Sequence, residues 1–137
     1  MSGVARFVDG VPTIVLSARH LSEDHFWFTF FHEASHLLLH DPSEIFLDDE
    51  EQLTREVTES AEDEANHFAM QVLTPEPHGI KRSRWLSHRD VIRRAHEIGI
   101  SPGVLVGQLQ HEGVLSFDTL NGLKRRYKWN GSSLEKA

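Results

Sequence analysis

The sequence predicts an α+β fold. A small antiparallel sheet is expected to pack on a central helix with the motif H-E-x-x-H and on a second long helix, followed by a helical C-terminal part. Two observations predict this: apolar stretches flank Asp9-Gly10, and periodic segments separated by proline or glycine follow them. At 137 residues the chain is long enough for one domain. We expect a core over residues 1–77, a helical part of the same domain over 78–130 and a flexible tail over 131–137.

Composition excludes several classes of protein. The chain has no cysteine, so it forms neither disulfides nor thiolate metal sites. The N-terminus, MSGVARFVDG, lacks the basic and apolar regions of a secretory signal. The longest apolar run is interrupted by His32 and Glu33 and is too short to span a bilayer. We therefore expect a soluble, cytoplasmic protein that does not bind membranes.

Charge is divided unevenly along the chain. Residues 1–80 hold 3 Lys and Arg against 16 Asp and Glu, whereas residues 81–137 hold 11 against 5. A basic second half is typical of a face for nucleic acid or for an acidic partner. The alternative, which we favour, is that the two halves attract each other within one fold.

The first two elements follow from turn and capping residues. Residues 4–17 predict a β-hairpin around Asp9-Gly10, with Pro12 in an edge strand because proline has no N–H for a ladder. Ser22 is a suitable helix cap, and the acidic residues after it favour the positive end of the helix dipole. This helix should run to about His40, be apolar nearly all round, and lie in the middle of the domain.

The remaining elements are predicted from apolar periodicity and from the proline, glycine and serine residues that bound them. We expect a short strand over 44–49, an acidic loop over 48–51 and a helix over 53–73 that ends before Pro75. Ser87 and Gly99 bound a third helix, and Pro102 begins a fourth that ends near Gly113. A last short helix over 118–126 should precede the frayed tail.

The central helix carries a metal-binding pattern. His32 and His36 lie four residues apart, so on a helix their imidazoles point the same way, about one turn apart. Both can then bind one Zn²⁺. Glu33 is rotated by about 100° from His32, so it can reach the open coordination position without being a ligand. At that position it can take a proton from a metal-bound water whose pKa the zinc has lowered. The alternative is that the two histidines are ordinary core residues bonded to the backbone. We disfavour it, because burying two imidazoles and a carboxylate on an apolar helix is costly unless a metal pairs them.

A third metal ligand must come from another element. His40 is two turns from His32 and too distant to share the ion, which leaves the glutamates of the second helix. Of these, Glu62 alone lies at the edge of the apolar stripe, whereas Glu59 and Glu64 are rotated away from it. Asn66, one turn after Glu62, can hold a ligand histidine by its second ring nitrogen.

These motifs together resemble a known family. FTFFHEASHLLLH, followed about thirty residues later by EDEANHFAMQVLTP, is similar to the ImmA/IrrE family of zinc-dependent peptidases. The resemblance places the third ligand of the family on Glu62, four residues before the asparagine. It covers residues 4–77, and GISPGVLVGQLQHEGVLSFDTLNGLKRRYKW also resembles the C-terminal part of members that carry an Xre-type helix-turn-helix domain.

The resemblance implies a zinc metalloendopeptidase that cleaves a regulatory protein. The implied substrate is an Xre-type transcriptional repressor, acting in cis or in trans, and cleavage should be narrow or dependent on a partner. Two departures are visible: Ser35 replaces the glycine that many members have, and the Xre domain is missing. Because the chain begins so close to its first strand, we expect it to be a fragment of a longer protein.

Two alternatives belong to other classes of protein. Residues 90–110 have helix-turn-helix character, but only Gln108, Gln110 and His111 could read base edges, so we expect no direct DNA binding. The other alternative is a regulatory or antitoxin-like module with a structural or latent zinc site. His111 is also a candidate oxyanion donor, but a helix-terminal role at the dipole is preferred.

Overall fold

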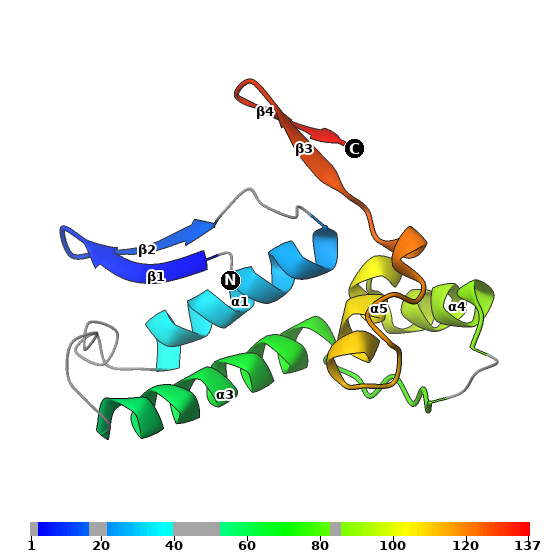
Figure 1. Cartoon of the computed structure of the whole chain (residues 1–137), viewed down its shortest axis with the longest axis horizontal. Coiled ribbons are helices and arrows are strands. Elements are labelled where there is room, and N and C mark those ends of the chain that lie inside the picture. Colours follow the sequence, from blue (N-terminus) through cyan, green and yellow to red (C-terminus); the bar gives the residue numbers. More distant parts are fainter. Residues whose placement is uncertain (1–2, 17–21, 40–52, 83–85) are drawn as a thin grey trace. The chain divides into compact units, whose positions relative to one another are not determined.

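Figure 1 shows the computed structural model, which describes residues 3–16, 22–39, 53–82 and 86–137, with side chains in the third range from residue 59 onward. The expected strand over 44–49, the acidic loop and His40 lie outside these residues. The chain divides into two compact units, Met1–Ser17 with Phe28–Val72 and Ala18–Trp27 with Leu73–Ala137. The elements comprise helices and antiparallel hairpins, which confirms the α+β class.

The first unit begins with the predicted hairpin. Strands β1 (Gly3–Val8) and β2 (Val11–Leu16) pair in antiparallel register, with Val8 opposite Val11. Asp9 and Gly10 both have positive φ, 50° and 79°, as a two-residue type I′ turn requires. At the other end of β1, a Cβ on Gly3 would lie 2.8 Å from Thr29 Cγ2 and 3.0 Å from Glu33 Cγ. Glycine at this position therefore allows the sheet to pack closely on the central helix.

The central helix α1 (Glu23–Leu39) and the long helix α3 (Leu53–Leu73) have the predicted bounds within the described residues. The small side chains Ala65 and Ala69 of α3 are completely buried. The prediction for α1 was only partly right, because Thr29, His32 and Ser35 are buried whereas Trp27 and Leu38 are exposed. Its buried face in this unit is thus largely polar. No helix in the described part of the chain has the length and apolar character needed to cross a bilayer.

The second unit contains the main apolar core. Helix α4 (His88–Ile98) begins at a capping box of Ser87 and Asp90 and ends at Gly99, which has a φ of 84°, as predicted from its flanking residues. Helix α5 (Pro102–His111) starts with proline in its first turn. The two helices bury a continuous cluster of apolar side chains: Val91, Ala95, Leu105, Val106, Leu109 and Leu115.

Two glycines of α5 make room for the acidic first turn of α1. A Cβ on Gly103 would lie 2.0 Å from Glu23 Oε1, and one on Gly107 would lie 2.6 Å from Asp24 Oδ2. Asp24 Oδ2 also pairs with Lys124 Nζ at 2.9 Å. These acids are therefore held between α5 and the segment after it, and the ion pair joins residues from the acidic and the basic halves of the sequence.

The chain after residue 117 differs from the prediction of a helix over 118–126. Only a 3₁₀ turn, η1 (Asn121–Leu123), forms there, after Leu120 with a left-handed φ of 61°. Beyond it, the backbone N–H of Glu23 donates to the carbonyl of Arg125 at 2.9 Å, and the N–H of Arg125 donates to Glu23 Oε1 at 3.1 Å. Pairing with the start of α1 thus holds this segment extended.

The predicted tail instead forms the turn and the second strand of a C-terminal hairpin. Strands β3 (Tyr127–Asn130) and β4 (Ser133–Lys136) pair with Trp129 opposite Leu134. Gly131 in the turn has a φ of 61°. The sequence signal was Gly131-Ser132 between a tryptophan and a leucine, a dipeptide typical of a two-residue hairpin turn. The prediction of a flexible tail over residues 131–137 was therefore wrong.

We predict that Gly103→Ala destabilises the chain by about 1–3 kcal/mol, the usual cost of overpacking. The new methyl group would lie 2.7 Å from Lys124 Cα, a backbone atom that cannot move aside without its neighbours. Gly122→Ala is the matched control, because a Cβ there meets no atom within 4 Å. Urea denaturation of both variants and the wild type measures the difference. Equal stabilities of the two variants would contradict this packing.

Candidate metal centre

The site is built on the facing surfaces of two helices of the first unit. Helix α1 contributes His32 and His36, four residues apart, and α3 contributes Glu62. A spacing of four places both imidazoles on the same side of α1. The buried alanines of α3 allow that helix to approach closely, because they add little bulk beyond the backbone. Local helical geometry and helix packing thus bring the three side chains together.

The ligand atoms converge tightly. His32 Nε2 lies 2.9 Å from Glu62 Oε2, and His36 Nε2 lies 2.9 Å from Glu62 Oε1. The two Nε2 atoms are 3.4 Å apart. Tetrahedral zinc bonds of about 2.0–2.1 Å imply ligand separations of roughly 3.3 Å. The histidine pair matches that separation, and the carboxylate lies slightly closer.

Asn66 determines how the first histidine is turned. Asn66 Oδ1 lies 2.7 Å from His32 Nδ1. An amide oxygen can only accept a hydrogen bond, so Nδ1 carries the proton and donates it. In neutral His32 the lone pair then belongs to Nε2, which faces His36 and Glu62. Asn66 thus holds the His32 imidazole in the way that outer partners hold metal-bound histidines in other proteins.

The chemistry of this donor set fits a metal ion. The carboxylate of Glu62 accepts only, and the Nε2 atom of neutral His32 also accepts only. Two such acceptors 2.9 Å apart repel each other unless a proton or a cation lies between them. Three nitrogen and oxygen donors also form the protein ligand set of catalytic zinc sites, which leave one coordination position open.

Glu33 lies beside this group on α1 and is 4% exposed. The backbone N–H of Ala5 in β1 donates a hydrogen bond to its carboxylate. Burial raises the pKa of Glu33 above its usual value, and the charge of Glu62 acts in the same direction, whereas His32 and the Ala5 hydrogen bond lower it. A carboxylate with a raised pKa is a better proton acceptor near neutral pH.

Two contacts of the site were not predicted from the sequence. Ser35 is fully buried, and its hydroxyl donates to the carbonyl of His32 at 2.6 Å. A serine thus fits at the position where many members of the resembled family have glycine. The hydrogen bond from Ala5 had no sequence signal, because it uses a backbone group and depends on strand packing. Glu62 is less exposed than Glu59, Asp63 and Glu64, as its position relative to the apolar stripe predicted.

Other candidate residues lie in the second unit. Gln108 and Gln110 are 2% and 3% exposed. Gln108 Nε2 donates to Thr74 Oγ1 at 2.8 Å, and Gln110 accepts from Lys124 Nζ at 2.8 Å. His111 lies edge-on to the ring of Phe117, and burial lowers its pKa. The two glutamines are therefore part of the interior of this unit.

Comparison with protein families places the metal-binding helices within a known family. The model of the family Peptidase M78, described as the IrrE N-terminal-like domain, matches residues 1–109. The match includes both hairpin strands of the first unit, α1, α3 and α4, and ends within α5. It extends beyond residue 77, where the most specific motifs end. Comparisons with curated proteins and with solved structures found no match.

We predict that Glu62→Gln loses metal under mild chelation and that Glu64→Gln retains it. Glutamine preserves the shape of the side chain but removes the negative charge that offsets the cation. The Glu62 variant should also melt at a lower temperature when zinc is present, because metal binding is coupled to folding. Metal content by mass spectrometry, with both variants treated together, makes the comparison. Retention in Glu62→Gln with loss in Glu64→Gln would contradict the ligand assignment.

Proposed function

The chain belongs to the IrrE N-terminal-like family of peptidases, Peptidase M78, and on this premise we propose that it is a zinc-dependent metalloendopeptidase. The convergence of His32, His36 and Glu62 supports a metal-dependent mechanism more than any other observation. We assign these three residues as metal ligands, Asn66 as the residue that orients His32, and Glu33 as the general base. Zn²⁺ is the proposed cofactor because two imidazole nitrogens and a carboxylate oxygen form a donor set that zinc would accept.

The proposed reaction is hydrolysis of a peptide bond. A bound zinc ion would act as a Lewis acid, polarising the scissile carbonyl and lowering the pKa of water. Glu33 takes a proton from the attacking water as its oxygen forms a bond with the carbonyl carbon. The same carboxyl group then donates that proton to the amine nitrogen as the carbon–nitrogen bond breaks. Burial of Glu33 supports this role, since it favours the protonated form that the second step requires.

We propose a regulatory protein as the substrate, specifically an Xre-type repressor that acts in cis or in trans. This proposal comes from the resemblance of the motifs to regulators in which such a domain accompanies the peptidase. We also propose that the enzyme acts in the cytoplasm, since repressors are bound to DNA there. Narrow specificity is expected, because a small domain has limited surface on which to position a protein substrate.

Direct DNA binding by this chain is not part of the proposed function. Of the three residues of α5 that could read bases, Gln108 and Gln110 are buried and hydrogen-bonded within the second unit. Base reading in the major groove requires donors and acceptors that reach the base edges. Their burial supports an architectural role for this segment.

We predict that Glu33→Gln retains zinc and the fold but loses cleavage by at least about 100-fold, the contribution of a positioned general base. The test incubates zinc-loaded wild type and variant with an Xre-type repressor and with a proteome-derived peptide library, and reads new termini by mass spectrometry. Cleavage at the wild-type rate by the variant would refute the mechanism. A chain that binds one zinc ion but cleaves nothing would support the latent or structural site instead.

A second prediction concerns specificity. Zinc-loaded wild-type protein should digest casein far more slowly than a general metalloprotease assayed at the same molar concentration, because it lacks a large surface for binding unfolded chains. Release of fluorescent peptides from labelled casein measures this rate. Rapid digestion would contradict narrow specificity while leaving the peptidase assignment intact.

A further inference from the structure

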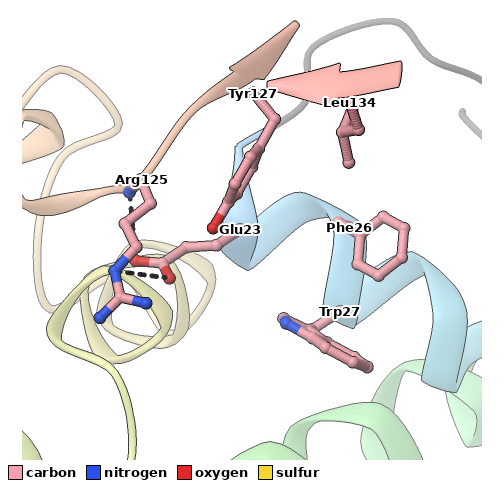
Figure 2. A pocket seen from close by; sticks show the side chains of 6 residues that line it. All are labelled: Glu23, Phe26, Trp27, Arg125, Tyr127 and Leu134. Atoms are coloured by element: carbon pink, nitrogen blue, oxygen red, sulfur yellow. Dashed lines mark hydrogen bonds and ion pairs between the residues drawn. The ribbon is translucent and has the colours of Figure 1, made fainter. Parts of the chain in front are cut away.

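The second unit contains a pocket of about 340 Å³ between the first turns of α1 and the C-terminal hairpin. Figure 2 shows the side chains that line it: Glu23, Phe26, Trp27, Arg125, Tyr127 and Leu134. Ligand pockets span about 300–1,000 Å³, so this one is at the lower end of the range. Its size suits a side chain or a small group and excludes a large cofactor.

The walls of the pocket are mainly apolar and aromatic. Phe26 and Trp27 meet edge to face, with ring centroids 5.1 Å apart and planes at 86°. Tyr127 and Leu134 come from the opposite side of the pocket, from β3 and β4 (Figure 2). Phe26, Trp27 and Leu134 are all exposed in spite of their apolar character. Apolar side chains grouped around an open pocket are typical of a binding site.

One end of the pocket carries two charged residues, Glu23 and Arg125, and they differ in how many of their polar atoms have hydrogen-bond partners. Glu23 is buried, and its Oε1 accepts from Ser101 Oγ at 2.8 Å and from the Arg125 N–H at 3.1 Å. The Arg125 side chain is 60% exposed and pairs with Glu23 Oε2 only through Nε, at 3.9 Å. Among the contacts described for this unit, its two terminal nitrogens have no acceptor. This end of the pocket therefore favours an anionic group.

We propose that this pocket binds a protein segment in which an apolar side chain is flanked by an acidic residue. The apolar side chain enters between Phe26, Trp27 and Leu134, and the flanking carboxylate pairs with the terminal nitrogens of Arg125. Arg126 and Lys128, one and three residues after Arg125, are exposed and add positive charge to the same segment. The proposal goes beyond the peptidase function, because binding at this pocket requires no metal.

The shape of the pocket favours a peptide over a nucleic acid. Bases bind to proteins largely by stacking on the flat face of an aromatic ring. The perpendicular rings of Phe26 and Trp27 form a corner instead of a parallel slot. A branched aliphatic or aromatic side chain fills such a corner.

The test uses NMR titration of the ¹⁵N-labelled full chain with three acetylated pentapeptides. The first has leucine at the centre and aspartate on both sides, the second has asparagine flanks, and the third has a central serine. We expect the first peptide to shift the Trp27 indole signal, assigned with a Trp27→Phe variant, and to bind most tightly. The gain over asparagine flanks should be about fivefold, the upper end for an exposed ion pair.

Two variants locate the effect. Arg125→Gln should abolish the preference for aspartate over asparagine while leaving the fold unchanged, because the backbone of Arg125 makes the hydrogen bonds to Glu23. Lys128→Gln is the matched control, because it removes a cation three residues after Arg125 whose side chain lies on the face of the hairpin opposite to that of Tyr127. It should keep at least half of the preference. Equal loss in both variants would mean nonspecific attraction and would overturn the proposal.

Further results of the titrations would also test the proposed peptide binding. Absence of any shift at low-millimolar peptide, or equal shifts with all three peptides, would overturn the proposal. Displacement of the peptide by a single-stranded oligothymidylate at lower concentration would assign the pocket to nucleic acid. The titrations are run on metal-free and on zinc-loaded protein. Binding in both forms together with no cleavage activity would contradict only the proposed peptidase function.

Discussion

The hydrogen bond between His32 Nδ1 and Asn66 Oδ1, 2.7 Å long, determines which way the first imidazole of the candidate metal centre points. It joins α1 to α3 and assigns the Nε2 lone pair to the side where His36 and Glu62 lie. The same contact requires the two helices to approach closely, which the buried alanines of α3 permit. Helix packing, tautomer and metal affinity therefore depend on one another, and a metal ion would in turn stabilise the helix pair.

The first turns of helix α1 belong to the second unit, and its later turns belong to the first. Its first turn carries Glu23 and Asp24, which are held in the second unit by the glycine face of α5 and by Lys124. Its later turns carry His32, Glu33 and Ser35, which are buried in the first unit. Of the buried polar groups in the first unit, His32 and Ser35 are hydrogen-bonded, and Glu33 has a catalytic role in the proposed mechanism. This explains why a helix with so many aromatic residues has a largely polar buried face.

The elements that could be predicted are those with local signals. The type I′ turn at Asp9-Gly10, the capping box at Ser87 and the proline start of α5 each depend on the conformational preferences of one or two residues. The segment after residue 117 was predicted wrongly because long-range hydrogen bonds to Glu23 hold it extended. Helix propensity is weak enough for such tertiary contacts to override it.

The same distinction applies to the candidate site. By itself, the sequence determined that His32 and His36 share a helix face and that Glu62 lies at the edge of an apolar stripe, because helical periodicity is a local property of the chain. Only the tertiary structure decided that the Ala5 amide reaches Glu33, that Gln108 and Gln110 are buried, and that Phe26 and Leu134 line one pocket. Those contacts join residues distant in sequence, and they depend on how elements pack, which no local pattern of residues encodes.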